Sequence, residues 1–461
     1  MKIFNTISRK KEELKTIQPN EVGIYACGPT VYSSPHIGNM YAYVSWDILV
    51  RSLRYLDYKV KYVMNVTDVG HLTSDADTGE DKMEKGSQKE GLSVWEIAKK
   101  YEKEFFDDEN KLNIVRPDVV CKATDNIKEQ IELIQKIEAN GFAYQISDGL
   151  YFDTSKFANY ADFAKLNLEQ LKEGARVEIN PEKRNLSDFA LWKLSGQARQ
   201  MEWESPWGKG FPGWHIECTA MSAKYLGVPF DIHTGGIDHI PVHHTNEIAQ
   251  AYGAFGKSIV NYWMHNGFMT FKGVKLSKST GGLFTISDLE EMGFEPLAFR
   301  YMVLTSSYRN GLDFSLENLK ASYVALNKLK QFVLEMKEKI VVITEVDKEY
   351  ESEFRNKIED DLAMPEVIAL VWKLLKSDLS DYKKLGTLYE FDKVLGFNLK
   401  GLSRTIDDIS QEVLLLVNNR KKAREEKNWG ESDRLRKLIE EKGYVVEDLQ
   451  NDCKIRKVMV I

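Results

Sequence analysis

The feature that most constrains the fold lies between Glu21 and Thr67. The segment "EVGIYA" (Glu21 to Ala26) has the pattern of a short strand, and after a loop rich in glycine and proline the apolar residues recur at helical spacing. The segment "KVKYVMNVT" (Lys59 to Thr67) then predicts a second strand. Strand, helix and strand in this order form a βαβ unit, which implies a parallel sheet. Because ligands of such sheets bind where the strands end, we expect a binding site around Cys27 to Asn39.

The α/β pattern is interrupted once and then resumes. Residues 121–201 break it, so we interpret them as an insertion. It returns with a helix in "PGWHIECTAMSAKYLG", a strand in "PFDIHT", a helix in "VHHTNEIAQAYGAF" and a strand in "SIVNYWMHNGF". From about Ser315 the spacing is helical, and a further helix opens at Pro365, a residue favoured in the first helical turn.

Composition sets the class of protein. The chain has 461 residues, of which 43% are hydrophobic and 29% charged, as is typical of a globular protein of several domains. It has no apolar run near the ~18 residues that a membrane helix needs and no signal-like start, so we expect no membrane association. Its four cysteines include no C-x-x-C pair, which favours a reducing cytoplasm over a disulfide framework.

Charge gives a mixed indication about nucleic acid. The net charge of −7 counts against a dedicated nucleic-acid binder. From Arg420 to the end, however, 12 lysines and arginines stand against 9 acidic residues. A solvated helical face explains this surplus as well as a basic binding surface does.

Two motifs have the chemistry of phosphate binding. The stretch "HIGN" (His36 to Asn39) precedes the first helix, where backbone N–H groups and the helix dipole stabilise an anion, and Gly38 allows close approach. The stretch "KLSKSTGG" (Lys275 to Gly282) is a basic, glycine-containing loop. Either stretch alone is more often an ordinary loop or a solvated turn.

A second group of residues has the chemistry of a metal site. His243 and Glu247 are four apart, so they share a helical face, and Cys218 lies on another predicted helix. With Cys27 they would supply two sulfurs, one imidazole and one carboxylate, a set that suits Zn²⁺. Spacing alone does not join Cys27 to Cys218. Each residue also has an ordinary interpretation, as a small buried hydrophobe or as part of a surface pair.

Taken together, these motifs resemble those of the cysteinyl-tRNA synthetase family. "HIGN" and "KLSKS" are similar to the two signature motifs of class I aminoacyl-tRNA synthetases, and "CGPTVY", "NVTD", "GWHIEC", "HHTNEIAQ" and "NYWMHNGF" extend the likeness over essentially the whole chain. Asn39 and Leu276 depart from the usual signatures, in which a histidine and a methionine stand.

The resemblance implies a fold and a division of the chain. The fold class is α/β: a Rossmann-type parallel sheet with an inserted connective subdomain, then a C-terminal α-helical bundle and a small terminal tRNA-binding domain. We expect the catalytic domain in 1–120 and 202–270, the insertion in 121–201 and the loop and stem-contact region in 271–315. The helical bundle would occupy 316–400 and the last domain 401–461.

The resemblance also implies an activity. The enzyme would activate L-cysteine with ATP and Mg²⁺ and transfer it to the terminal adenosine of tRNA(Cys), as a monomer. The implied zinc ligands are Cys27, Cys218, His243 and Glu247, and the substrate's own sulfur would join them. The implied catalytic residues are His36, Asn39, Lys275 and Lys278; the ATP site would include Gly28, His36, Gly38, Asn39 and Lys278. Thr67, Trp214, His233 and Asp238 would lie near the bound cysteine.

A zinc ion would explain how cysteine is separated from serine. An ordinary pocket distinguishes such near-isosteres by only ~1–3 kcal/mol, whereas zinc prefers a thiolate to a hydroxyl. Two other readings stay open. A ligase that joins cysteine to an amino-sugar would share the zinc and the adenylate chemistry but would lack the C-terminal third. A non-catalytic regulator derived from a synthetase would bind nucleotide and zinc without pyrophosphate exchange.

Overall fold

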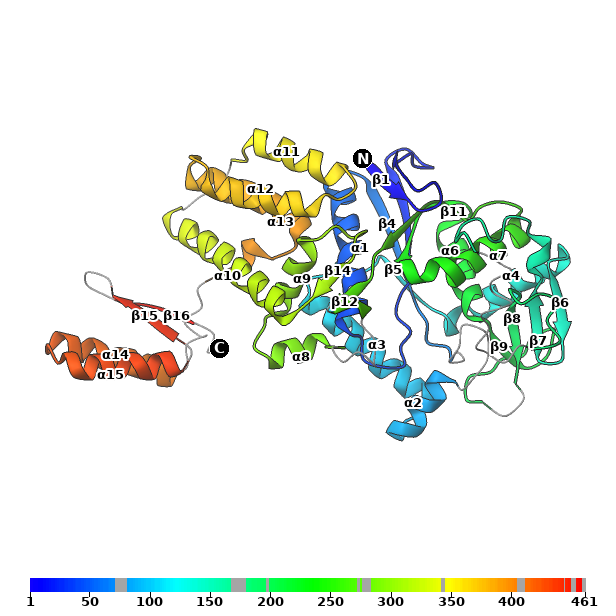
Figure 1. Ribbon diagram of the computed structural model, residues 1–461, viewed down its shortest axis with the longest axis horizontal. Coiled ribbons are helices and arrows are strands. Elements are labelled where there is room, and N and C mark those ends of the chain that lie inside the picture. The colour runs from blue at the N-terminus through cyan, green and yellow to red at the C-terminus, as the bar shows by residue number, and fades with distance from the viewer. Residues whose placement is uncertain are drawn as a thin grey trace. The chain divides into compact units, whose positions relative to one another are not determined.

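The chain forms two compact units, Met1–Lys400 and Gly401–Ile461. The computed structural model shown in Figure 1 describes residues 1–70, 81–166, 180–195, 199–271, 274–275, 283–340, 345–403, 411–442, 444–448 and 453–457.

A five-stranded parallel sheet organises the first unit. Its order is β11-β10-β3-β4-β5, from β3 (Glu21–Ala26), β4 (Lys59–Val66), β5 (Val119–Lys122), β10 (Phe230–Gly236) and β11 (Val260–Asn266). The predicted βαβ unit is confirmed, because β3 and β4 pair in parallel and α1 (Ile37–Tyr55) connects them. From β3 the chain adds β4 and then β5 on one side. It later adds β10 and β11 on the opposite side of β3, so the direction in which strands are added reverses between β3 and β10. Ligands of open α/β sheets bind at such a reversal.

Helices cover both faces of this sheet. Helix α1 contacts β4 and β10, and Figure 1 shows it on the side opposite α6 (Trp214–Leu226) and α7 (Thr245–Phe255). On the α6 side, Tyr25, Val63 and Trp263 from the strands pack with apolar residues of α6, α7 and α4 (Ile127–Ala139). Tyr25 pairs with Val63 in register, and His233 of β10 pairs with both Tyr25 and Trp263, so these side chains lie side by side on one face of the sheet.

The insertion forms its own antiparallel sheet, of order β6-β7-β8-β9. Its strands are β6 (Ala143–Ile146), β7 (Gly149–Phe152), β8 (Phe189–Leu194) and β9 (Gly210–Pro212). The last strand follows residue 201 and leads directly into α6, so this sheet is joined to the element that carries Cys218.

A smaller sheet and two helices follow β11. The sheet has the order β13-β12-β14, from β12 (Met269–Phe271), β13 (Val274–Lys275) and β14 (Leu312–Phe314), with α8 (Ile286–Glu291) and α9 (Pro296–Leu304) between its strands. Further elements of the unit are β1 (Lys2–Asn5), β2 (Lys10–Glu13), α2 (Lys82–Glu90) and α3 (Val94–Lys111).

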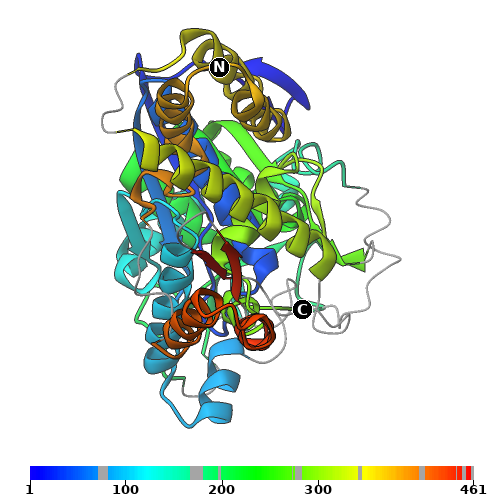
Figure 2. The ribbon, with the colours of Figure 1, turned by 90° about the vertical axis from the view of Figure 1, so that its left-hand side faces the viewer.

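A helical bundle ends the first unit. It contains α10 (Leu316–Lys339), α11 (Lys348–Glu359), α12 (Met364–Lys376) and α13 (Asp381–Leu395), which Figure 2 shows from the side. Asp361, in the α11–α12 turn, ties the bundle to the N-terminal strand. Its Oδ1 accepts hydrogen bonds from the Phe4 N–H at 2.8 Å and the Tyr308 hydroxyl at 2.7 Å. The bundle is therefore built into the unit through buried contacts.

The second unit is a helical hairpin and a β-hairpin. Helices α14 (Gln411–Glu425) and α15 (Trp429–Glu441) pack with β15 (Tyr444–Asp448), which pairs antiparallel with β16 (Cys453–Lys457). Its core includes Val413, Val417, Ile439, Tyr444 and Val446. The architecture confirms the predicted α/β class with an inserted subdomain and C-terminal helices. Among the helices of the described ranges, none is long and apolar enough to cross a membrane.

Candidate metal and nucleotide site

The structure brings Cys27, Cys218, His243 and Glu247 together at the strand-order reversal. Cys27 follows β3, and its N–H donates to the Thr234 carbonyl of β10 at 3.1 Å. Cys218 lies on α6, His243 in the π-helical turn Ile240–His244, and Glu247 in the first turn of α7. One ligand atom from each residue lies within 4.8 Å of each of the others. All four side chains are buried, with Cys27 the most exposed at 9%.

Gly235 allows the histidines of this region to pack closely. A Cβ atom at Gly235 would come within 2.6 Å of His244 Cε1 and 2.8 Å of His239 Nδ1. Any other residue at this position would push these rings away. Packing next to the cluster therefore explains the first glycine of the stretch "HTGG".

Two histidines lie against the Glu247 carboxylate, one at each oxygen. His233 Nε2 lies 2.9 Å from Oε2, and His243 Nε2 lies 3.0 Å from Oε1. Burial opposes the ionised carboxylate, but His233 and His243 lower the pKa of Glu247 to about 2. Burial likewise opposes the imidazolium, but Cys218 and Glu247 raise the pKa of His243 to about 10. The carboxylate is thus held ionised in a buried setting.

The donor set fits zinc. Burial raises the pKa of the Cys27 thiol, and the hydrogen bond with Cys27 together with burial raises that of Cys218. Two thiolates at this depth need a compensating cation, because burying an unpaired charge is costly. Zinc bonds of about 2.0–2.3 Å place tetrahedral ligands roughly 3.3–3.8 Å apart, within the 4.8 Å spread of the four atoms.

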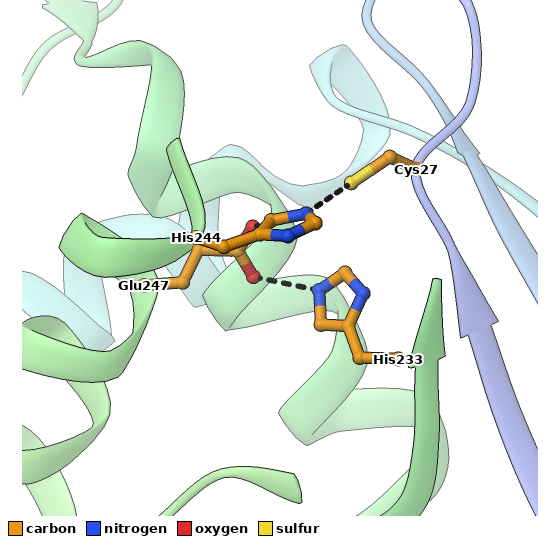
Figure 3. Close-up of side chains that lie close together, drawn as sticks. All are labelled: Cys27, His233, His244 and Glu247. Carbon is orange, nitrogen blue, oxygen red and sulfur yellow. Dashed lines mark hydrogen bonds and ion pairs between the residues drawn. The ribbon is translucent and has the colours of Figure 1, made fainter. Parts of the chain in front are cut away.

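A second group of ligand atoms overlaps the first. Cys27, His233, His244 and Glu247 also lie within 4.8 Å of one another, and Figure 3 shows their side chains converging. In this group Cys27 Sγ is 3.2 Å from His244 Nε2. The other nitrogen of His244, Nδ1, lies 2.7 Å from His265 Nε2, whose ring continues to the Thr6 hydroxyl at 2.8 Å. His244 is therefore already engaged on both sides.

Sequence reasoning missed most of this histidine cluster. Six of the eight histidines of the chain lie between 215 and 265, and all six are drawn into ring contacts around the candidate ligands. His215 Nδ1 is 2.9 Å from His243 Nδ1, so it supports a candidate ligand directly. The concentration of histidine in one stretch is a signal that could have indicated these residues.

The residues expected near the bound cysteine lie at different depths. The Trp214 ring is 4.8 Å from that of His243, at the start of α6. The Thr67 hydroxyl donates to Glu217 Oε2 at 2.8 Å. His233 is fully buried and stacks on Trp263 at 4.5 Å, whereas Asp238 is exposed.

The predicted phosphate residues gather at the start of α1. His36 is the N-cap: its Nδ1 accepts from the Asn39 N–H at 3.2 Å, while its own N–H donates to the Asn39 side-chain oxygen at 3.1 Å. Asn39 therefore completes a capping box. The Ile37 N–H donates to the Phe284 carbonyl at 2.8 Å, which brings the segment after the lysine loop against this helix end.

Gly28 and the two lysines complete the predicted set. A Cβ atom at Gly28 would lie 1.6 Å from the Asn65 carbonyl oxygen, so packing alone requires glycine here. Lys275 ends β13, and its side chain is outside the described part of the structure. Lys278 lies outside the described residues.

The fold and family comparisons agree with this arrangement. The family model described as the class I (C) tRNA synthetase catalytic domain matches residues 13–324. A solved structure of Mycobacterium tuberculosis methionyl-tRNA synthetase in complex with methionyl-adenylate superposes with a TM-score of 0.55. It covers 82% of this chain and 90% of that chain at 18% identity, which supports the fold alone. The fold and the matched domain define a class I aminoacyl-tRNA synthetase.

Curated relatives narrow the class. The cysteine–tRNA ligase 1 of Burkholderia lata is 45% identical over 97% of this chain and 94% of its own length. The cysteine–tRNA ligase of Treponema denticola is 43% identical over 97% of this chain and 98% of its own length. The chain belongs to the cysteine–tRNA ligase family.

Proposed function

We propose that this chain activates L-cysteine with ATP and transfers it to tRNA(Cys), and that a zinc ion held by Cys27, Cys218, His243 and Glu247 selects the substrate by its sulfur. The observation that supports this most directly is the meeting of two sulfurs, one imidazole and one carboxylate at the strand-order reversal. When bound, zinc would favour a thiolate ligand over a hydroxyl and so separate cysteine from serine.

The ligand set with two sulfurs is favoured over the overlapping group. It supplies a second sulfur, Cys218, and zinc readily takes thiolate ligands, whereas the overlapping group has Cys27 as its one sulfur. His233 forms a hydrogen bond with Glu247 and stacks on Trp263. This suits a residue that does not bind the metal itself but fixes the orientation of a metal ligand. We therefore assign His233 and His244 as supports of the metal ligands.

The phosphate chemistry is assigned to the start of α1 and to the lysine loop. In the reaction, the cysteine carboxylate attacks the α-phosphate of ATP, which gives cysteinyl-adenylate and pyrophosphate. His36, the Gly38 backbone, the Asn39 side-chain amide and the lysines Lys275 and Lys278 would stabilise the charge that develops on the phosphates, with Mg²⁺ bound to ATP. The Ile37–Phe284 hydrogen bond supports this, because it places Phe284, two residues after the lysine loop, beside the helix start.

The C-terminal unit is proposed to recognise tRNA. Trp429 is 57% exposed, and the Arg424 guanidinium lies 5.7 Å from its ring centre. An exposed aromatic ring beside a cation is suited to stacking on an unpaired base. The ligase for an amino-sugar would have no use for this unit.

Cysteine-dependent exchange of pyrophosphate into ATP, together with charging of tRNA(Cys), tests the function. We expect exchange with cysteine and none with serine, and we expect zinc near one equivalent in the purified protein. Exchange without tRNA charging would favour the amino-sugar ligase. Absence of exchange in the zinc-loaded protein would favour the non-catalytic regulator.

A further inference from the structure

A buried chain of hydrogen bonds connects the two cysteine-bearing elements. The Gly28 N–H donates to Asn65 Oδ1 at 2.8 Å, and Asn65 Nδ2 donates to Thr67 Oγ1 at 3.1 Å. The Thr67 hydroxyl then donates to Glu217 Oε2 at 2.8 Å. Asn65, Thr67 and Glu217 are at most 2% exposed. Such a network, shielded from water, fixes the orientation of its members.

The two ends of this chain lie next to the sulfurs in sequence. Gly28 follows Cys27, and Glu217 precedes Cys218. Thr67 sits between them at the end of β4, where its N–H donates to the Pro29 carbonyl at 2.9 Å and its carbonyl accepts from the Val31 N–H at 3.2 Å. Hydrogen bonds therefore fix both the backbone and the side chain of Thr67.

The hydrogen bonds of Thr67 determine what its oxygen can still do. A hydroxyl has one hydrogen to donate and two lone pairs to accept with. The hydrogen of Thr67 is directed to Glu217, and one lone pair receives the Asn65 amide. The remaining lone pair can accept a hydrogen bond, and the group has no further hydrogen to donate.

We propose that Glu217 is a positioning residue, which orients the Thr67 hydroxyl as an acceptor for the ammonium group of the amino-acid substrate. The inference rests on the proposed function and on the family resemblance, which implies that Thr67 lies near the bound cysteine. An ammonium group is a donor only, whereas a carboxylate is an acceptor only. The orientation set by Glu217 therefore favours the amino end of the substrate and disfavours its carboxylate. Glu217 itself acts through Thr67.

Three thiol ligands separate this role from support of the metal. L-Cysteine carries both end groups, cysteamine lacks the carboxylate, and 3-mercaptopropionate lacks the ammonium. Their dissociation constants are measured by calorimetry on the zinc-loaded full chain. For Glu217→Met we expect cysteine and cysteamine to bind about ten-fold more weakly or worse, because a hydrogen bond to a charged group is lost. Binding of 3-mercaptopropionate should stay within about two-fold.

Three controls accompany the test. Glu217→Gln offers an amide oxygen that can still accept from Thr67, so it should recover most of the affinity for cysteine. Lys224 lies on the same helix and pairs with Glu129 at 2.7 Å, outside the chain of hydrogen bonds. Lys224→Met should therefore leave all three affinities unchanged. In Thr67→Val, the further change Glu217→Met should have no added effect, since the group through which it acts is gone.

The proposal is overturned if Glu217→Met weakens all three ligands equally, or none of them. It is also overturned if the absorption spectrum of the Co²⁺-substituted site changes in Glu217→Met, because Glu217 would then shape the metal site itself. If instead the wild-type chain shows no cysteine-dependent pyrophosphate exchange, it is the proposed function that fails.

Discussion

Two adjacent histidines differ in what they can offer a metal. His243 faces Cys218 and Glu247, whereas His244 is engaged by Cys27 and His265. We predict that His243→Asn lowers zinc content far below one equivalent, because it removes a direct ligand. His244→Asn should keep most of the zinc and lose affinity by about 10–100-fold, as is typical of a supporting residue. Elemental analysis and zinc titration distinguish the two, and the reverse result would assign zinc to the overlapping group.

The candidate site also shows where sequence reasoning stops at the level of residues. Helical spacing joined His243 to Glu247, and the structure places their side chains 3.0 Å apart. No local period could join Cys27 to Cys218, because strand order in the sheet brings them together; the family resemblance supplied that link. The structure, and not the sequence, shows a role for Asn39: its side chain completes the N-terminal cap of α1 together with His36. Glu217 carried no signal, because its partner Thr67 lies 150 residues away.

At the level of elements, a buried ion pair joins helices from distant parts of the first unit. Arg300 of α9 pairs with Asp47 of α1, and both side chains are fully buried. Arg300 Nε also donates to the Leu395 carbonyl at the end of α13, at 2.6 Å. We predict that Arg300→Met destabilises the fold by about 2–4 kcal/mol, because it removes the buried pair and the donor to the buried Leu395 carbonyl, while Arg51 still pairs with Asp47 at 2.8 Å. Urea unfolding measures this.

An exposed ion pair of α1 provides the control for that measurement. Arg54 pairs with Asp118 at 3.0 Å, and their side chains are 35% and 44% exposed. Arg54→Met should change stability by less than about 1 kcal/mol. If Arg54→Met and Arg300→Met lowered the free energy of unfolding by similar amounts, the buried pair would not be a special contributor to stability.

Helix α3 contributes a pH dependence. Burial raises the pKa of Glu109 to about 8, against the opposing effect of Arg116. The folded state therefore binds a proton more tightly than the unfolded state, so this group favours folding below the ordinary glutamate pKa, and its contribution is lost as pH rises to about 8. Because of Glu109, the free energy of unfolding of the unaltered protein should fall by on the order of 1 kcal/mol per pH unit between about pH 5 and 8. We predict that this fall is absent in Glu109→Gln. Urea unfolding at several pH values checks this, and parallel curves for the two proteins would contradict it.

Elements were more predictable than their connections. The strands at Glu21–Ala26 and Lys59–Val66 follow the predicted segments closely, because hydrophobic patterning is local. The helix predicted over "VHHTNEIAQAYGAF" begins instead as a π-helical turn, Ile240–His244, before α7. That irregular turn carries His243 and His244, and residue spacing gave no sign of it.

At the level of the whole molecule, the structure shows where the chain can be divided. A cut near Leu316 would remove the Asp361 contacts to Phe4 and Tyr308 and the Arg300 contact to Leu395, all of which hold the bundle in the first unit. A cut after Lys400 follows the boundary between the compact units. The second cut is therefore the one that tests the role of the C-terminal unit.

We predict that a chain ending at Lys400 keeps cysteine-dependent pyrophosphate exchange within a few-fold of the full chain, because every candidate zinc ligand and the start of α1 lie in the first unit. Its kcat/KM for charging tRNA(Cys) should fall by about 10²-fold, as expected when base stacking and phosphate contacts worth about 3 kcal/mol are lost. Trp429→Ala in the full chain should reproduce part of this loss, whereas Tyr382→Ala, an exposed aromatic of the bundle, should not. The salt dependence of tRNA binding should also become shallower in the shortened chain, since fewer cations meet phosphates. If the shortened chain charges tRNA as well as the full one, tRNA recognition belongs to the first unit.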